Sequence, residues 1–291
     1  MIRKISIITL KGLLGLVVLV SGAYLFMSFL LEKRIQKAYA VETREIYFSA
    51  NEALLEQGKH LYTIKGCEAC HGRDLSGKVM LDEPAVGFFA GSNITYGAGG
   101  LPADYKEKDW VRALRHGLNQ EGKPLLVMPS QELYKMSDKD ISALIAYCMR
   151  QPPVDKQVPP VKLGPLGTIL SALGQIPLIS AETIDHNYAA PAEIEALPDA
   201  TYGRYLALAC SGCHNQNLKG GEAKVPGMKP YPDITTSGNV GRWTEEQFIQ
   251  TLRTGQTPEG KQMKNEEMPW QMTKAYTDTE LKALYAYLKT L

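Results

Sequence analysis

The chain has 291 residues, of which 44% are hydrophobic and 22% are charged, and its formal net charge is +1. This composition excludes an intrinsically disordered chain, and a mean hydropathy of −0.19 excludes a polytopic membrane protein. The near-neutral charge gives no electrostatic footprint for nucleic acid. The length favours roughly two domains, and five cysteines, an odd number, do not fit a framework built only of disulfides.

The first predicted element is an apolar run from Leu13 to Leu31 that contains no charged residue. As a helix rising 1.5 Å per residue, it is just long enough to cross a hydrocarbon core about 30 Å thick. The alternative is a signal peptide cleaved after Ala40, because Ala38 and Ala40 form an A-x-A site. The run is longer than a usual signal-peptide core, so we expect residues 1–40 to form an uncleaved anchor and stalk.

The anchor carries much of the positive charge. Six of the 32 basic residues but only one of the 31 acidic residues lie in the first 40 positions, so the rest of the chain has a formal charge of −4. A mildly acidic remainder does not favour anionic membrane surfaces as partners. Basic residues flank the apolar run on both sides, so the positive-inside rule barely discriminates between the two orientations.

Four of the five cysteines form two identical C-x-x-C-H motifs, Cys67 to His71 and Cys210 to His214, with Cys70 and Cys213 as the second cysteines. The pattern is typical of haem c attachment, since two thiols one helical turn apart bond two vinyl groups and the adjacent histidine ligates the iron. A zinc site would need a second ligand pair, and a redox dithiol would need a βαβ context. The motifs therefore predict two covalently attached haem c groups.

The two motifs belong to a longer repeat with an offset of about 140 residues. Tyrosines stand five residues before each motif, and further matches follow it. The matching pairs are Tyr62 and Tyr205, Leu75-Ser-Gly77 and Leu218-Lys-Gly220, Asn93-Ile-Thr95 and Asp233-Ile-Thr235, Leu114-Arg-His-Gly117 and Leu252-Arg-Thr-Gly255, Met128-Pro129 and Met268-Pro269, and Ala146-Tyr147 and Ala286-Tyr287. We predict two copies of one domain, at 41–152 and 198–291, joined by a linker at 153–197.

Each copy contains a middle helix and a terminal helix. The middle helix is predicted to end at Gly117 in one copy and Gly255 in the other, each a C′ glycine. The terminal helix opens with Ser137-x-x-Asp140 or Thr277-x-x-Glu280, a capping-box pattern. Its apolar face has helical spacing, and its members are Ile141, Leu144, Ile145 and Cys148 in one copy and Leu281, Leu284, Tyr285 and Leu288 in the other. Cys148 is thereby explained as a buried apolar residue.

The segment between the copies is rich in proline and ends the repeat. Its apolar part, Leu163 to Ile179, predicts a short helix that covers one haem domain rather than a docking site. His186 has no counterpart in the repeat, and we expect it to make only local hydrogen bonds.

The second axial ligands are predicted from the repeat. Met128 and Met268 follow the motif histidines at similar distances, and each precedes a proline. Methionine–histidine ligation raises the potential and leaves no open position on the iron. The alternative is bis-histidine ligation by His60 or His116, whose repeat partners are not histidines. The methionines without a methionine counterpart are treated as structural, and they are Met136, Met263 and Met272.

Taken together, these features resemble class I cytochrome c domains in tandem, and specifically the membrane-anchored dihaem c-type cytochromes similar to cytochrome c subunits of bacterial alcohol and gluconate dehydrogenases. The motifs that carry the resemblance are the two C-x-x-C-H motifs, the Asn93-Ile-Thr95 segment, the Leu-Arg-x-Gly turns, the Met-Pro pairs and the helix at Leu281 to Leu288. The resemblance covers about residues 50–152 and 198–291. It implies an all-α fold behind one N-terminal transmembrane helix. Those dehydrogenase subunits usually carry three haem domains, whereas this chain has two motifs.

The resemblance also implies roles for a repeated proline and a repeated arginine. The carbonyl of Pro84 or Pro226 would accept a hydrogen bond from the motif histidine and fix its tautomer, although an ordinary loop proline is the alternative. Arg115 and Arg253 would pair with haem propionates, unless they are solvated surface arginines.

If both irons are six-coordinate, the chain has no position for a substrate, so we expect an electron-transfer protein and not an enzyme. Single electrons would pass from a dehydrogenase or quinol-oxidising complex to a soluble cytochrome or terminal oxidase in a respiratory chain. Covalent haem attachment outside the bacterial cytoplasmic membrane places the N-terminus inside and the haem domains in the periplasm. The alternative from another class is a dihaem enzyme, a peroxidase or a thiosulfate-oxidising cytochrome, with one open or unusually ligated haem. A haem-based sensor is disfavoured because no signalling segment follows the anchor.

Overall fold

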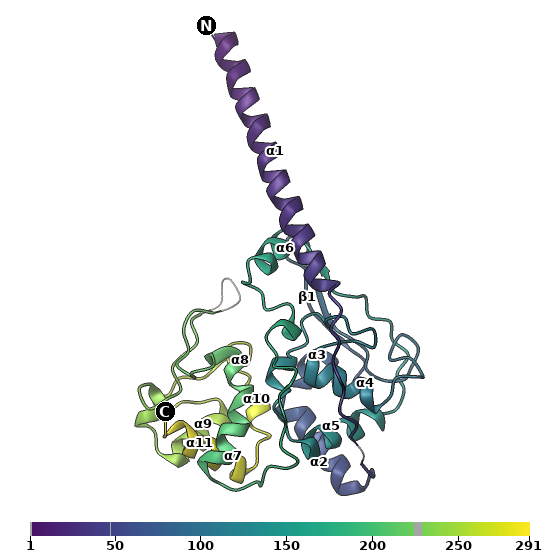
Figure 1. Ribbon diagram of the computed structural model, residues 1–291. Coiled ribbons are helices and arrows are strands. Elements are labelled where there is room, and N and C mark those ends of the chain that lie inside the picture. Colours follow the sequence, from purple (N-terminus) through teal and green to yellow (C-terminus); the bar gives the residue numbers. More distant parts are fainter. Residues whose placement is uncertain (1, 47, 224–228) are drawn as a thin grey trace.

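The computed structural model describes residues 2–46, 48–223 and 229–291, and it places one long helix apart from two helical units that lie side by side (Figure 1). The long helix, α1 (Ile2–Ile35), is continuous and runs away from the rest of the molecule. Residues Thr9–Ile35 of α1 are long and apolar enough to span a membrane, in agreement with the predicted anchor.

The first unit contains four α-helices and two shorter helical turns. The α-helices are α2 (Glu52–Ile64), α3 (Cys67–His71), α4 (Glu107–Val111) and α5 (Asp138–Met149), and the turns are a π-helical turn, η1 (Arg112–His116), and a 3-10 turn, η2 (Ser130–Glu132). Ser137 accepts a hydrogen bond from the Asp140 amide at the start of α5, as its position predicts. Gly117 ends the middle helix with φ of 65°, the left-handed conformation that favours glycine.

The second unit repeats this order. Its α-helices are α7 (Ala200–Leu206), α8 (Ser211–His214), α9 (Glu245–Thr254), α10 (Trp270–Thr273) and α11 (Asp278–Leu288), and its 3-10 turns are η4 (Ala207–Ala209) and η5 (Asn239–Arg242). Thr277 and Glu280 form the predicted capping box at the start of α11, and Gly255 ends α9 in the left-handed conformation. The predicted terminal-helix faces are buried in both units, except that Tyr285 is half-buried.

In each unit the first helix packs closely on the terminal helix, α2 on α5 and α7 on α11. A glycine makes this approach possible, because a Cβ at Gly58 would lie 2.0 Å from the Ala143 carbonyl oxygen and a Cβ at Gly203 would lie 1.9 Å from that of Ala283. Gly58 and Gly203 are therefore structurally equivalent. Tyr62 and Tyr205, which match by distance from the first cysteine, are not.

A small antiparallel sheet departs from the all-α expectation. Its strands are β1 (Lys78–Glu83), β2 (Gly87–Gly91) and β3 (Lys162–Leu163), in the order β1-β2-β3. Two strands form a hairpin in the first unit, and the third comes from the linker. At Gly87 φ is 136°, and a Cβ would lie 2.4 Å from the carbonyl oxygen of Lys162, so only glycine fits this junction.

The linker holds the base of α1 against the first unit. It contains α6 (Pro165–Ala172), which packs on both α1 and β2, and a 3-10 turn, η3 (Ser180–Glu182). Arg34 of α1 donates two hydrogen bonds to Glu182, at 2.8 and 2.6 Å. Leu31 is buried in a small apolar cluster with Leu178 and Ile179. The predicted short covering helix is confirmed, and it also braces the membrane helix.

Candidate haem-attachment sites

Both C-x-x-C-H motifs form short helices that follow the first helix of their unit. The two cysteines of each motif lie one turn apart, in α3 for the first motif and at the N-cap and within α8 for the second, and none of the four forms a disulfide. Burial raises the pKa of Cys67 to about 12 and that of Cys210 to about 11. Burial therefore favours the neutral thiol form of both cysteines.

The motif histidines are oriented alike in the two units. Nδ1 of His71 donates to the carbonyl of Ser92 at 2.8 Å, and Nδ1 of His214 donates to the carbonyl of Pro232 at 2.8 Å. The two acceptors are equivalent in the repeat, since each directly precedes the Asn-Ile-Thr or Asp-Ile-Thr segment. In the described part of the chain, neither Nε2 has a hydrogen-bond partner, and this is the nitrogen that an iron would take.

The prediction that the Pro84 carbonyl accepts the hydrogen bond from His71 was wrong. Pro84 lies in the turn between β1 and β2, and the carbonyl of Ser92 accepts the hydrogen bond from His71 instead. Pro226 lies outside the described residues, and the observed acceptor in the second unit is Pro232. A backbone carbonyl can come from any residue, so the identity of the side chain was a poor guide.

The two predicted methionine ligands have matched backbone geometry. Pro129 has φ, ψ of −81°, 52° and Pro269 has −74°, 63°, so each Met-Pro pair makes an inverse γ-turn. The Met128 carbonyl accepts from the Ser130 amide at 2.9 Å, and the Met268 carbonyl accepts from the Trp270 amide at 2.7 Å. Both methionines are half-buried. The structure thus supports their equivalence, and their role as ligands remains a prediction.

The two alternative histidine ligands have partners elsewhere. Nε2 of His60 donates to the Glu280 carboxylate of the other unit, at 2.9 Å, and is thereby occupied. Nδ1 of His116 lies 3.1 Å from Nδ1 of His186, whose Nε2 donates to the Ala181 carbonyl at 3.0 Å. His186 therefore does more than make local bonds, because it ties the linker to the first unit.

The His116 pair makes a testable contribution to stability. Burial, reinforced by His186, lowers the pKa of His116 to about 4. A folded-state pKa below the ordinary 6.5 means that the unfolded chain binds more protons in this window. The contribution is complete above pH 6.5 and is lost as the pH falls towards 4.

We expect the free energy of unfolding to drop by about 2 kcal/mol across that window through this group. The measurement is denaturant unfolding at several pH values for the wild type and for His116→Gln. The variant should lose this part of the pH dependence, and parallel curves would contradict the account.

The repeated arginines clamp the loop before the terminal helix. Arg115 donates to the carbonyls of Tyr134 and Met136 and to the Asp138 carboxylate, at 2.8 to 2.9 Å. Arg253 does the same with the carbonyl of Lys274 and the carboxylate of Asp278, at 2.7 and 2.6 Å. Neither arginine is simply solvated, since both have these specific partners, and their pairing with haem propionates stays a prediction.

Two of the other sulfur-containing residues lie in the core. Cys148 and Met136 are buried, and burial raises the pKa of the Cys148 thiol well above its ordinary value, as expected for an apolar core residue. Met272 lies beside Gly66, directly before the first motif, at 3.1 Å from the position of a Cβ there. This methionine therefore belongs to the contact between the two units.

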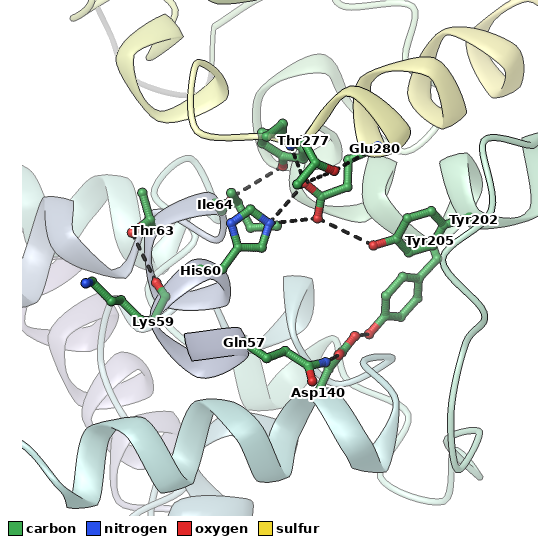
Figure 2. Close-up of polar contacts among 11 residues, drawn as sticks. Gln57, Lys59, His60, Thr63, Ile64, Asp140, Tyr202, Tyr205, Thr277 and Glu280 are labelled. Carbon is green, nitrogen blue, oxygen red and sulfur yellow. Dashed lines mark hydrogen bonds and ion pairs between the residues drawn. The ribbon is translucent and has the colours of Figure 1, made fainter. Parts of the chain in front are cut away.

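The two units meet through a reciprocal exchange of hydrogen bonds (Figure 2). Asp140 at the start of α5 accepts from Gln57 of its own unit at 2.6 Å and from Tyr205 of the other unit at 2.5 Å. Glu280 at the start of α11 accepts from Tyr202 of its own unit at 3.4 Å and from His60 of the other at 2.9 Å. Each carboxylate thus binds equivalent positions of α2 and α7, which makes the interface pseudo-twofold.

The same symmetry brings the attachment segments to the interface. The Glu132 carboxylate of η2 lies 2.3 Å from the position of a Cβ at Gly212 in α8, and Met272 of α10 lies 3.1 Å from the position of a Cβ at Gly66, directly before α3. The hydroxyl of Tyr276 donates to the Ile64 carbonyl at 3.2 Å. Each unit therefore contacts the other directly next to its C-x-x-C-H helix, a feature that no sequence pattern had suggested.

The residues present fit covalently attached haem. Each unit offers two thiols one turn apart that form no disulfide, and a histidine whose Nδ1 is already bonded to a backbone carbonyl. Within the described ranges, no three His, Cys, Asp or Glu side chains form a metal-binding cluster.

Two family models match the chain, one for each of the two helical units. Residues 200–291 match the model of the cytochrome c family, and residues 53–148 match that of the cytochrome c oxidase, cbb3-type, subunit III family. Each of the two units therefore resembles a cytochrome c family, and these matches support an electron-transfer role with haem.

Curated relatives match more than four-fifths of this chain. The fructose dehydrogenase cytochrome subunit of Gluconobacter japonicus is 28% identical over 84% of this chain and 54% of its own length. The alcohol dehydrogenase (quinone) cytochrome c subunit of Gluconobacter oxydans is 24% identical over 83% and 55%, respectively. The gluconate 2-dehydrogenase cytochrome c subunit of Pantoea cypripedii is 26% identical over 83% and 60%. The chain spans about half the length of these relatives.

These findings confirm the predicted resemblance to membrane-anchored cytochrome c subunits of dehydrogenases. The candidate spanning helix agrees with a membrane anchor. The haem count, the ligands and the redox partners are matters for the proposal that follows.

Proposed function

We propose that this cytochrome carries two covalently attached haem c groups and passes single electrons between them. Haem 1 would be held by Cys67, Cys70 and His71, with Met128 as the second axial ligand. Haem 2 would be held by Cys210, Cys213 and His214, with Met268. When bound, each haem supplies a one-electron redox centre, and the protein supplies burial, ligation and docking surfaces.

The observation that carries this proposal is the pseudo-twofold interface between the domains. Contacts across it adjoin both attachment helices, through Met272 at Gly66 and Glu132 at Gly212. Such a fixed arrangement would keep the two haems close without domain motion. Such a pairing suits the transfer of an electron from one haem to the other.

The relatives' names point to the electron donor. Because they are cytochrome subunits of fructose, alcohol and gluconate dehydrogenases, the donor proposed here is a membrane-associated dehydrogenase, or else a quinol-oxidising complex. The acceptor is a downstream soluble cytochrome or terminal oxidase. α1 would cross the cytoplasmic membrane with the N-terminus inside, which places both haem domains in the periplasm.

The test uses the full chain, purified in detergent and titrated anaerobically with a one-electron reductant. Two electrons per chain are expected, and one electron for the double variant Cys67→Ser/Cys70→Ser. Neither reduced haem should bind carbon monoxide, since both irons are six-coordinate. Tight binding of carbon monoxide by one haem of the wild type would contradict the carrier proposal and favour a dihaem enzyme.

The donor is tested with membranes that contain this cytochrome and a candidate dehydrogenase. Adding the dehydrogenase substrate should reduce the haem c of chains with both motifs intact. The reduction is followed by the appearance of the absorption band of reduced haem c. The proposal would be wrong if neither sugar, alcohol nor quinol oxidation reduced the cytochrome.

A further inference from the structure

The side chain of Lys65 ends in a buried position between the two domains. Lys65 directly follows α2 and stands two residues before Cys67. Part of its aliphatic stem reaches the surface, yet its Nζ is inaccessible to solvent and has no hydrogen-bond partner in the described ranges of the chain. A buried ammonium without a partner is costly, so this position calls for an explanation.

Groups from both domains surround this ammonium. The carboxylates of Asp140 from α5 and Glu280 from α11 attract it, and it lies 5.4 Å from the centre of the Tyr205 ring of α7. Lys65 thus lies directly before the first attachment segment and also contacts the second domain, through the ring of Tyr205.

The two carboxylates do not need Lys65 as a hydrogen-bond donor. Asp140 is bound by Gln57 and Tyr205, and Glu280 by His60 and by the amide of Thr277. Burial lowers the pKa of Lys65, and the nearby carboxylates oppose that effect. In its charged form Lys65 offsets these two carboxylates, one from each domain, without a direct hydrogen bond to either.

We propose that Lys65 is a positioning residue for electron transfer, whose buried positive charge raises the reduction potential of both haems. This inference rests on the proposed dihaem function. A cation stabilises the added electron on each reduced haem. A unit charge about 10 Å away, at an effective dielectric constant of about 20, changes a one-electron reduction constant roughly tenfold.

The test is spectroelectrochemical titration of the full chain in detergent. In Lys65→Met, which keeps the length of the side chain and removes its charge, both reduction constants should fall roughly tenfold, or ~59 mV for a one-electron couple. Lys65→Arg should restore wild-type values. Lys59→Met is the matched control on the exposed side of the same helix and should leave both potentials unchanged.

Three results would overturn the proposal. They are unchanged potentials in Lys65→Met, a fall confined to one haem, or an equal fall in Lys65→Arg, which would indicate a role in packing alone. Wild-type uptake of two electrons is measured first. Failure there would reject the dihaem function, whereas unchanged potentials with intact uptake would reject only the role of Lys65.

A second variant tests the sign of the effect. Glu280→Gln removes a negative charge from the same interface and keeps a side chain that can still accept a hydrogen bond from His60. Both potentials should therefore rise. If Lys65→Met does not fold, Glu280→Gln still tests the proposal. Unchanged or lowered reduction potentials of the two haems in Glu280→Gln would overturn the proposed electrostatic coupling.

Discussion

Gly203→Ala should destabilise the second haem domain by about 3 kcal/mol or more. The added Cβ would lie 1.9 Å from the Ala283 carbonyl oxygen and 2.7 Å from the Cβ of Tyr287. Both are parts of α11 that cannot move without shifting the whole terminal helix. Gly58→Ala should have the same effect in the first domain, where the Ala143 carbonyl oxygen is 2.0 Å away. The measurement is the midpoint of chemical unfolding of the full chain.

Gly22→Ala is the control for this prediction, because a Cβ there meets nothing within 4 Å. It exchanges the same residues within a helix and should leave the midpoint nearly unchanged. Should Gly203→Ala and Gly58→Ala behave like Gly22→Ala, the close crossing of the first and terminal helices would not be what holds each domain together.

Met128→Ala and Met268→Ala should each open one haem and leave the other unchanged. Removing the thioether takes away the second axial ligand, so one iron of the two becomes able to bind an external ligand. The expected result is that each single variant binds carbon monoxide at half the haem, with a lower potential for that haem only. Absorption spectra with and without carbon monoxide, together with redox titration, make the measurement.

The matched control is Met263→Ala, because Met263 is also a half-buried methionine of the second domain and has no methionine counterpart in the first. It should bind no carbon monoxide. If Met128→Ala left haem 1 closed, the ligand would have to be another residue. His116, whose Nδ1 is bonded to His186, would then be the first to test.

Local patterns predicted the parts of the fold that depend on nearby residues. The helix ends at Gly117 and Gly255 and the caps at Ser137 and Thr277 are short-range features, and the structure has them where they were expected. The β1–β2 hairpin was missed because every residue of β1 is exposed, so no apolar alternation marks it. The third strand was missed because it comes from the linker and pairs with β2 over a long sequence separation. Two residues of pairing leave little pattern in the sequence.

The interface was missed for a different reason. Counting back from the cysteines matched Tyr62 with Tyr205, whereas helix packing matches Gly58 with Gly203 and therefore His60 with Tyr205. The second domain is two residues shorter between its first helix and its motif, and this difference hid the pseudo-twofold relation. The arginine and aspartate pairs, Arg115 with Asp138 and Arg253 with Asp278, also recur in the repeat, but each pair lies within one domain and reports the clamp before its terminal helix.

The central claim is that one chain carries two covalently bound haems, one in each cytochrome c domain. The most direct measurement is the intact mass of the full chain after expression with haem attachment, followed by peptide mapping. We predict a mass gain of two haem groups, one on the peptide with Cys67 and Cys70 and one on the peptide with Cys210 and Cys213. A gain of a single haem, or two unmodified cysteine pairs, would contradict the account.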